Sequence, residues 1–212
     1  MIDTARHFLP KSVILRTLDA MQYNKMNVLH WHITDDESFP LQLETFPNIT
    51  MMGRYAPDEV YSKNDVREIL AHAKENGIRV MPEIDTPGHV GGWGNDATMD
   101  EFIIHNCPGG EGYNSQLDPT LDVTYKYVGG VLTELKELFP DSFIHMGGDE
   151  VFGSCWNLRP EIQTRMKQLE IPDYNALQVY FRNQTRPFVS DRQLVYWAND
   201  AQHIPPAPTD II

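Results

Sequence analysis

Short apolar segments alternate with amphipathic segments along most of the chain, and this alternation constrains the fold more than any other feature of the sequence. Near-continuous apolar strands separated by helices are typical of a parallel sheet with helices packed against it. The sequence therefore predicts a parallel α/β fold with strands within residues 27–34, 78–85, 143–151 and 193–200.

Helical patterns fill the segments between these strands. Residues 12–24 place apolar side chains on one face. Ser62 and Asp65 form a start typical of a capping box, and Gly77 provides a stop for the same helix. A further helical stretch is expected over residues 160–191.

Residues 120–139 carry the clearest helical pattern. Their apolar positions step by three and four, which makes one continuous stripe: Leu121, Tyr125, Val128, Leu132, Leu135 and Phe139. Gly129 and Gly130 interrupt the segment at a cost of roughly 1 kcal/mol each in helix propensity. Close packing against a neighbour is the expected reason for this pair.

A (β/α)8 TIM barrel explains the pattern better than a nucleotide-binding sheet does. No glycine-rich phosphate loop follows the first strand. Polar residues follow several different strands, and the carboxyl ends of barrel strands are where active sites are assembled. Residues 1–3 form only the stub of a first strand, and residues 208–212 resemble the opening of a sixth. We therefore expect about the first five strands of the barrel.

Composition narrows the class of partner. The net charge of −13 disfavours nucleic acid and anionic membranes, because phosphates are bound by basic surfaces. No apolar run approaches the roughly 18 residues of a membrane helix. The opening MIDTARHF lacks the pattern of a signal peptide. A neutral ligand such as a sugar is compatible with this charge.

Two cysteines are too few to define a disulfide framework. Counting alone leaves open both a pair of buried thiols and a disulfide between Cys107 and Cys155. Sequons at Asn48 and Asn183 favour a secreted protein only slightly, because such triplets are common by chance.

Reactive or polar side chains follow four of the expected strands. If these strands line one barrel, the clusters converge on one bowl. They are Arg6, the pair Asp35 and Asp36, His89, and the pair Asp149 and Glu150.

The HWH triplet also fits a metal-dependent barrel hydrolase, which can bind its ion through two such histidines. That interpretation needs further ligands on later strands. Only His89 and His145 are available, without a recognisable ligand spacing. His30 and His32 are therefore expected to bond to neighbours in the barrel wall, and no metal or cofactor is expected.

The adjacent carboxylates Asp149 and Glu150 indicate chemistry on a glycosidic bond. In a poorly solvated bowl two neighbouring acids are driven to different protonation states, so one can donate a proton. Adjacent residues do not easily flank a sugar ring on opposite faces, so the nucleophile must come from elsewhere. Aromatic rings at strand ends could stack on the sugar, although core packing is the simpler role for each; they belong to Trp93, Trp156 and Trp197.

Four segments, in this order along the chain, carry a family resemblance: DTARHFLP, YNKMNVLHWHITDDESFP, GIRVMPEIDTPGH and HMGGDEV. They resemble the β-N-acetylhexosaminidases of glycoside hydrolase family twenty, from residue 3 to about residue 170. The resemblance implies an exo-acting enzyme that removes terminal N-acetylglucosamine or N-acetylgalactosamine. In that family the acetamido oxygen of the substrate attacks the anomeric carbon, giving an oxazolinium intermediate with retention.

The resemblance also implies roles for the matching residues. Glu150 would be the general acid and base, and Asp149 would orient the acetamido group. His89, backed by Asp35, would set the acidity of Glu150. Arg6 would bind sugar hydroxyls, and Trp197 would form a wall of the acetamido pocket.

By the same resemblance, Cys107 and Cys155 would form a disulfide in a lysosomal or extracellular protein. Residues 1–212 would be a partial catalytic domain, without the α/β domain that usually precedes the barrel and without its last strands. We therefore expect a fragment, or a chain whose barrel is completed by a partner chain or a second copy. A truncated, weakly active or inactive glycan-binding or structural remnant is the alternative to an enzyme.

Overall fold

The computed structural model describes residues 1–94, 98–108, 114–198 and 210–211, and within them five strands form one sheet. Neighbouring strands are parallel throughout, which confirms the predicted α/β class. Their spatial order follows the chain: β1 (Ile2–Asp3), β2 (Val28–Thr34), β3 (Arg79–Ile84), β6 (Phe143–His145) and β7 (Gln193–Val195).

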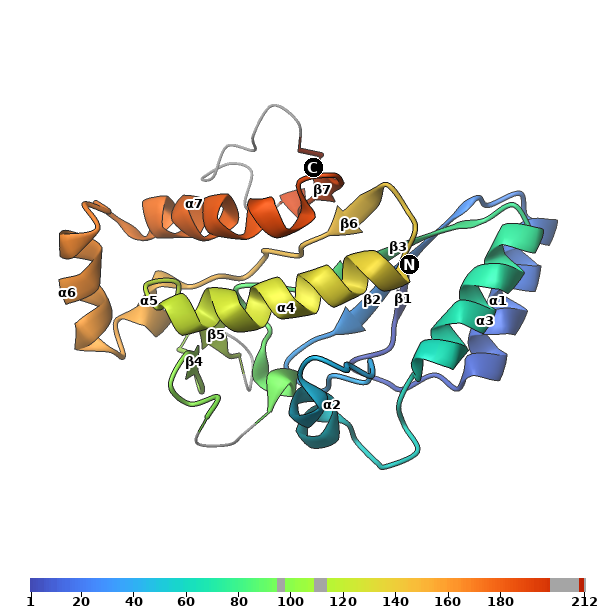
Figure 1. The fold of residues 1–212 in the computed structure, drawn as a ribbon, viewed down its shortest axis with the longest axis horizontal. Helices are drawn as coiled ribbons and strands as arrows, with labels where there is room; N and C mark the ends of the chain where they lie inside the picture. Colours follow the sequence, from blue (N-terminus) through green and yellow to red (C-terminus); the bar gives the residue numbers. More distant parts are fainter. Residues whose placement is uncertain (95–97, 109–113, 199–209, 212) are drawn as a thin grey trace.

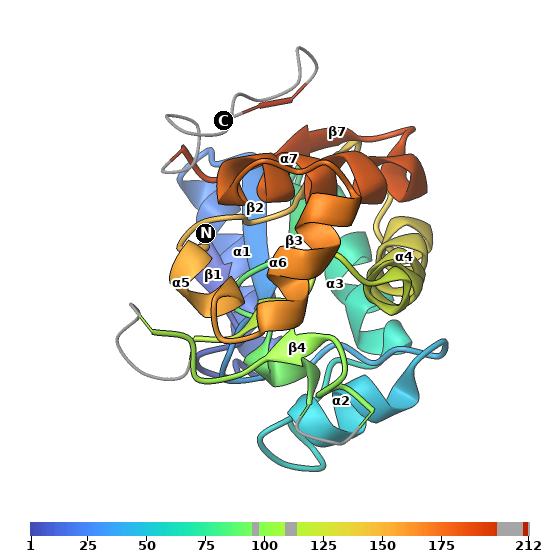
Figure 2. The ribbon, with the colours of Figure 1, turned by 90° about the vertical axis from the view of Figure 1, so that its left-hand side faces the viewer.

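A long helix connects each strand of this sheet to the next. Figure 1 shows α1 beside α3 and α4 beside α7, and the contacts between these helices agree. The 90° view in Figure 2 shows α4 next to α3 in the same way. The helices are α1 (Lys11–Tyr23), α3 (Lys63–Glu75), α4 (Asp122–Leu138) and α7 (Tyr174–Thr185).

Shorter elements fill the connections. They are α2 (Pro47–Gly53), η1 (Gly91–Trp93), α5 (Gly153–Trp156), α6 (Pro160–Gln168), η2 (Arg186–Val189) and the antiparallel hairpin of β4 (Ile103–Ile104) and β5 (Gln116–Leu117). The hairpin lies in what the sequence suggested was only a long loop. None of the described helices is both long and apolar enough to cross a membrane.

The predicted helix over residues 160–191 is wrong as a single element. It divides into α6, α7 and η2. The break has a local cause, because Pro172 disfavours helical torsions in the residue before it. Glu170 adopts φ +56°, and the Asp173 side chain then caps α7 by accepting from the Ala176 N–H.

Other helix boundaries follow the predicted signals. Ser62 and Asp65 form a reciprocal capping box at the start of α3. Gly77 has φ +69° immediately after that helix, where a residue without a Cβ is favoured.

Alternation along the strands separates an apolar face from a polar one. Leu29, Trp31 and Ile33 of β2 are buried in the main core beneath the helices. His30 and His32 point to the other face, and in the parallel register His32 lies beside Glu83 of β3. In a barrel this second face is the interior. The polar interior therefore follows from the period of two along each strand.

The last described residues continue the sheet. Ile211 forms a parallel bridge with Val195, and its N–H donates to the Leu194 carbonyl at 2.9 Å. This agrees with the expectation that another strand opens near residues 208–212, of which 208, 209 and 212 lie outside the described residues.

Gly129 and Gly130 of α4 are tightly packed, as expected. A Cβ on Gly129 would lie 2.5 Å from the Phe188 ring, and one on Gly130 would overlap the Phe46 ring. Aromatic rings from two other segments thus occupy the space that side chains would need.

Replacing Gly129 with Leu should lower the free energy of unfolding by about 1 to 3 kcal/mol, the usual cost of overpacking. Leucine is a much better helix former than glycine, so helix propensity predicts the opposite sign. Urea unfolding of G129L measures the effect, with Glu137→Leu on an exposed position of α4 as control. Adding Phe188→Ala should recover part of the loss. A G129L protein as stable as the original would contradict the packing explanation.

Candidate active site

A cavity of about 240 Å³ opens at the carboxyl ends of the parallel strands. Residues that follow four different strands contribute to it, and its lining is Met1, Arg6, His32, Asp85, Asp149 and Trp197. A larger cavity of about 470 Å³ lies at the opposite end of β3, with Leu70, Ile78 and Val80 in its lining. Because barrel chemistry is built at the carboxyl ends of strands, the smaller and more polar cavity is the candidate site.

The two glycines after β6 let the chain pass over Asp85. Gly147 and Gly148 have φ +67° and +95°, and a Cβ on Gly147 would overlap the Asp85 carboxylate. The Gly148 N–H donates to Asp85 Oδ1 at 2.8 Å. This turn delivers Asp149 and Glu150 to the mouth of the strand.

Asp149 lines the cavity, and its side chain is 24% exposed. Its Oδ1 is buried, and no described residue donates a hydrogen bond to it. The nearest charged partner, His89 Nδ1, is 3.8 Å away. Buried polar atoms are almost always paired in folded proteins, so an unpaired oxygen within a partly exposed carboxylate is unusual and makes Asp149 a candidate to accept from a ligand.

Glu150 belongs to a relay with two other side chains. Its Oε2 lies 3.2 Å from His89 Nε2, and His89 Nδ1 lies 2.8 Å from Asp85 Oδ2. The Glu150 side chain is 60% exposed, whereas Asp85 is buried. Glu150 and His89 both adopt left-handed torsions, φ +52° and +55°, a rare conformation that is concentrated at functional sites.

The relay holds a positive imidazolium. Burial alone would lower the pKa of His89, but the hydrogen bond to Asp85 and the nearby carboxylates outweigh it and raise that pKa to about 10. Burial raises the pKa of Asp85 to about 7. His89 therefore holds the shared proton at neutral pH, and its positive charge faces Glu150.

The expected pairing of His89 with Asp35 needs correction. Asp85 makes the hydrogen bond to His89, while Asp35 Oδ2 binds His32 Nε2 and Arg6 Nη2, each at 2.8 Å. A carboxylate oxygen of Asp35 lies within 4.8 Å of a ring nitrogen of His89 without a hydrogen bond between them. Asp35 therefore raises the pKa of His89 only through its charge. The spacing of Asp85 four residues before His89 was the signal available in the sequence.

Arg6 reaches the cavity from the loop after β1. Its guanidinium lies 2.9 Å from Asp3 and 2.8 Å from Asp35, and part of it remains exposed. Two carboxylates thus hold the group at the cavity, where exposed N–H donors can meet hydroxyls.

Only one of the three tryptophans considered as sugar platforms lies at the cavity. Trp93 and Trp156 are 0% exposed and belong to the two hydrophobic cores. Trp197 lines the cavity, and its indole N–H donates to Glu83 Oε1 at 2.9 Å. Sequence reasoning did not single out Glu83, which lies near the end of β3.

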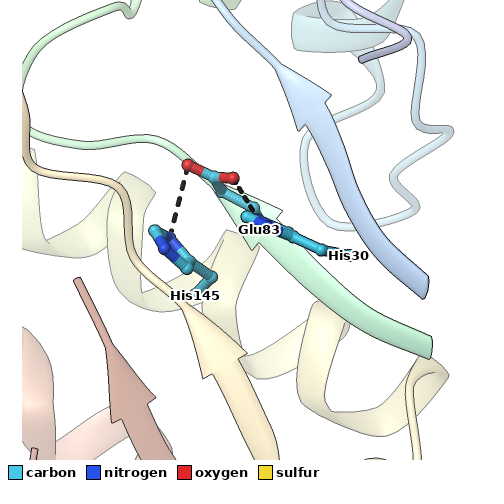
Figure 3. A group of neighbouring side chains, drawn as sticks. All are labelled: His30, Glu83 and His145. Carbon is cyan, nitrogen blue, oxygen red and sulfur yellow. Dashed lines mark hydrogen bonds and ion pairs between the residues drawn. The ribbon is translucent and has the colours of Figure 1, made fainter. Parts of the chain in front are cut away.

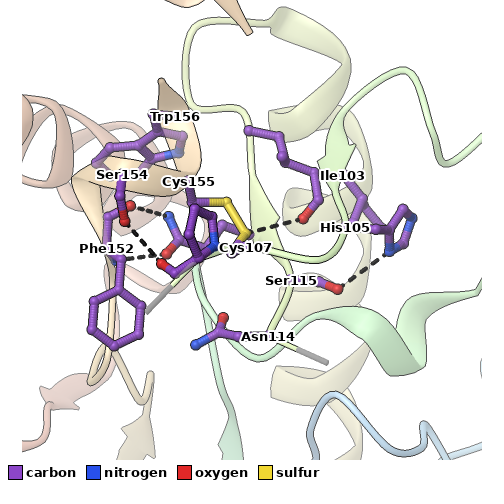
Figure 4. Close-up of a disulfide and its surroundings, with 12 residues drawn as sticks. Ile103, His105, Cys107, Asn114, Ser115, Phe152, Ser154, Cys155 and Trp156 are labelled. Carbon is purple, nitrogen blue, oxygen red and sulfur yellow. Dashed lines mark hydrogen bonds between the residues drawn. A yellow bond between two sulfur atoms is a disulfide. The ribbon is translucent and has the colours of Figure 1, made fainter. Parts of the chain in front are cut away.

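The cysteines form the expected disulfide. Figure 4 shows Cys107 joined to Cys155, five residues after Glu150. The side chain of Gln116 adds a second tie, since it accepts from the Phe152 N–H at 2.6 Å and donates to its carbonyl at 3.2 Å. The β4–β5 segment therefore braces the loop that carries the two acids.

Asp36 supports neighbouring loops. Its Oδ1 accepts from the Gly91 and Ser115 N–H groups at 2.8 and 2.9 Å, and burial raises its pKa to about 7. Its carboxylate is thus turned toward backbone groups.

Some clusters have the composition of a metal site. The group of His30, Glu83 and His145 offers three ligand atoms within 4.8 Å of one another. Figure 3 shows Glu83 between the two histidines and in contact with both. These atoms already have partners within the protein, because His30 Nε2 hydrogen-bonds Glu83 and His145 Nδ1 accepts from the Gly147 N–H, so hydrogen bonding accounts for the cluster.

Stability should fall as the pH rises from 7 to 10. His89 has a folded pKa of about 10 against about 6.5 unfolded, so the folded state keeps a proton that the unfolded state loses. His32, with a pKa also raised to about 10, acts in the same direction. Each contribution is complete below pH 6.5 and declines as the pH rises toward 10. Urea unfolding of H89Q should show a shallower decline than the original protein. Equal slopes would contradict the imidazolium assignment.

Comparison with known proteins gives a family. The family description "Glycosyl hydrolase family 20, catalytic domain" matches residues 1–212. The chain is 44% identical over 190 residues to the beta-hexosaminidase subunit beta of Homo sapiens, covering 85% of this chain and 33% of that protein. It is 40% identical over 195 residues to the subunit alpha of Rattus norvegicus, covering 90% and 36%.

Solved structures agree. An exo beta-N-acetylglucosaminidase from Vibrio harveyi, in complex with N-acetylglucosamine, aligns with a TM-score of 0.85 and 28% identity over 96% of this chain and 35% of that one. The fold and site define a portion of the (β/α)8 catalytic barrel of a glycoside hydrolase. The chain belongs to glycosyl hydrolase family 20. It spans about a third of the length of the curated relatives it matches.

Proposed function

We propose that the chain supplies the acid and acetamido-orienting groups of an exo-acting β-N-acetylhexosaminidase. The observation that carries the proposal is the partly exposed Asp149 carboxylate at the cavity, whose Oδ1 has no hydrogen bond from a described residue, one residue from an exposed Glu150 that contacts the His89 imidazolium. One carboxylate can accept an amide N–H, and its neighbour can exchange a proton with solvent or substrate. The family match supports the same chemistry.

The reaction would proceed in two steps with retention. The acetamido oxygen attacks the anomeric carbon and forms the ring C–O bond of an oxazolinium ion, while Glu150 gives its proton to the departing glycosidic oxygen. Asp149 accepts the amide N–H and stabilises the positive charge. Water, deprotonated by Glu150, then attacks the anomeric carbon and reopens the ring.

Other cavity residues would hold the terminal sugar. Arg6 would donate to its hydroxyls, which favours binding of a chain end, and Trp197 would cover the acetamido methyl. His89, fixed by Asp85, would hold the Glu150 carboxyl group in place through the 3.2 Å contact between His89 Nε2 and Glu150 Oε2.

We also propose a lysosomal or extracellular setting and a barrel completed by further residues or a partner chain. The disulfide supports an oxidising compartment. The described sheet ends at edges that a closed barrel would pair.

A hydrolysis assay on the full protein separates the enzyme from a non-catalytic remnant. Chromogenic N-acetylglucosaminide and N-acetylgalactosaminide should release phenol, and the matching glucoside without an acetamido group should not. The activity should persist in chelator. Turnover of the plain glucoside, or no turnover of either acetamido sugar, would reject the proposal; loss of activity with chelator would favour the metal-dependent alternative.

A further inference from the structure

Glu83 is a buried carboxylate with more partners than a core residue needs. Its side chain is 0% exposed and lies on the interior face of β3. Ring nitrogens of His30, His32 and Trp197 bind its two oxygens, and His145 Nδ1, which accepts from the Gly147 N–H, lies 3.3 Å from Oε1. Burial opposes its ionisation, but these hydrogen bonds hold the pKa of Glu83 well below its usual range. The group is therefore a fixed negative charge.

One hydrogen-bonded chain runs from Trp197 through Glu83 to Arg6. The Trp197 indole N–H donates to Glu83 Oε1 at 2.9 Å, and Glu83 Oε2 lies 3.0 Å from His32 Nδ1. His32 Nε2 is 2.8 Å from Asp35 Oδ2, which is 2.8 Å from Arg6 Nη2. The charges along the chain alternate in sign from Glu83 to Arg6. Both ends of the chain line the cavity.

Ring packing reinforces the Trp197 end. The His145 ring centroid is 4.6 Å from that of Trp197, and the His30 ring centroid is 5.4 Å away. His30 and His145 stack on each other at 4.6 Å, and both contact Glu83. Glu83 thus holds Trp197 directly and also orders the two rings against which it packs.

We propose that Glu83 is a positioning residue that fixes Trp197 and Arg6, two walls of the active-site cavity, relative to each other through this chain. The proposal rests on the proposed function, because it assigns these walls to the sugar. A sugar that contacts Trp197 through its acetamido group and Arg6 through its hydroxyls binds in one orientation only if the distance between these two side chains is fixed. Productive geometry in active sites depends on such supporting groups.

The test combines a spectroscopic reading with a double-mutant cycle in the full protein. With 5-fluorotryptophan incorporated, the fluorine signal of Trp197 is identified by its loss in W197F. Glu83→Gln should shift or broaden that signal, because a fixed acceptor of the indole N–H is lost. Glu134→Gln is the matched control: Glu134 is a nearly buried glutamate that binds backbone N–H groups and Lys63 away from the cavity. Where E83Q does not fold, Glu83→Asp keeps the charge but withdraws the oxygens.

The kinetic part of the test measures kcat/KM of the single and double variants to find whether Glu83 and Trp197 act together. E83Q and W197F should each lower kcat/KM on the order of tenfold, the effect of one hydrogen bond to a charged group. The double variant should lose clearly less than the product of the two single losses, because both substitutions remove the hydrogen bond between Trp197 and Glu83. A hundredfold loss in the double variant, or an unmoved Trp197 signal in E83Q, would overturn the positioning role. The fluorine signal can be measured without turnover. If the protein does not hydrolyse acetamido sugars but E83Q still shifts the Trp197 signal, the proposed function is rejected and the positioning of Trp197 is not.

Discussion

Replacing Glu150 with Gln should lower kcat/KM for an unactivated N-acetylglucosaminide by about 10²- to 10⁴-fold, the usual contribution of a positioned general acid. The variant keeps the size of the side chain and a partner for His89, but it has no proton to give to the leaving oxygen. The exposed position of Glu150 makes loss of stability a poor alternative explanation.

Comparing substrates whose leaving groups differ in acidity tests specifically whether Glu150 donates the proton. A dinitrophenyl N-acetylglucosaminide departs as a stable anion and needs little protonation, so E150Q should retain much more of its kcat/KM on that substrate. Glu161→Gln, an exposed glutamate at the start of α6, serves as control and should behave as the original protein. An equal loss on both substrates would show that Glu150 does not act as the acid.

Asp149→Asn should lower kcat by about 10²- to 10³-fold, the typical cost of removing one preorganised group that stabilises developing charge. The amide side chain is neutral and can turn its NH₂ toward the substrate amide, which reverses the intended hydrogen bond. The effect should fall on kcat more than on KM, since the positive charge develops in the transition state. Steady-state kinetics on the full protein measure both constants.

A matched control for Asp149→Asn is Asp58→Asn in an exposed loop. That variant should leave both constants unchanged. A D149N protein with normal kcat and a raised KM would mean that Asp149 only binds the ground state, and the orienting role would be wrong.

The strands and their order could be predicted from the sequence because each strand is a short, largely apolar segment separated from the next by a helical one. Local signals also located the capping box at Ser62 and the tight packing at Gly129. The break between α6 and α7 was missed because the amphipathic pattern continues across Pro172, and proline chemistry overrides it.

The site could be predicted in part because most of its residues lie in the segments that follow the strands. Arg6, Asp149 and Trp197 line one cavity as expected, and His89 contacts Glu150. The partner of His89 was assigned wrongly, because two acidic residues follow neighbouring strands and their distances depend on the register between β2 and β3.

Glu83 was missed for a related reason. A single glutamate inside an apolar strand has no visible function until the parallel register places His32 and His145 beside it. Trp93 and Trp156 show the opposite case, since both follow predicted strands and yet pack into cores.

Binding of a thiazoline mimic of the cyclic intermediate tests most directly whether the sugar supplies its own nucleophile. In the full protein the mimic should bind at least about 10²-fold more tightly than N-acetylglucosamine, as intermediate analogues do, and D149N should lose most of that difference. Equal affinities of the unaltered protein for the mimic and for N-acetylglucosamine would contradict participation of the acetamido group.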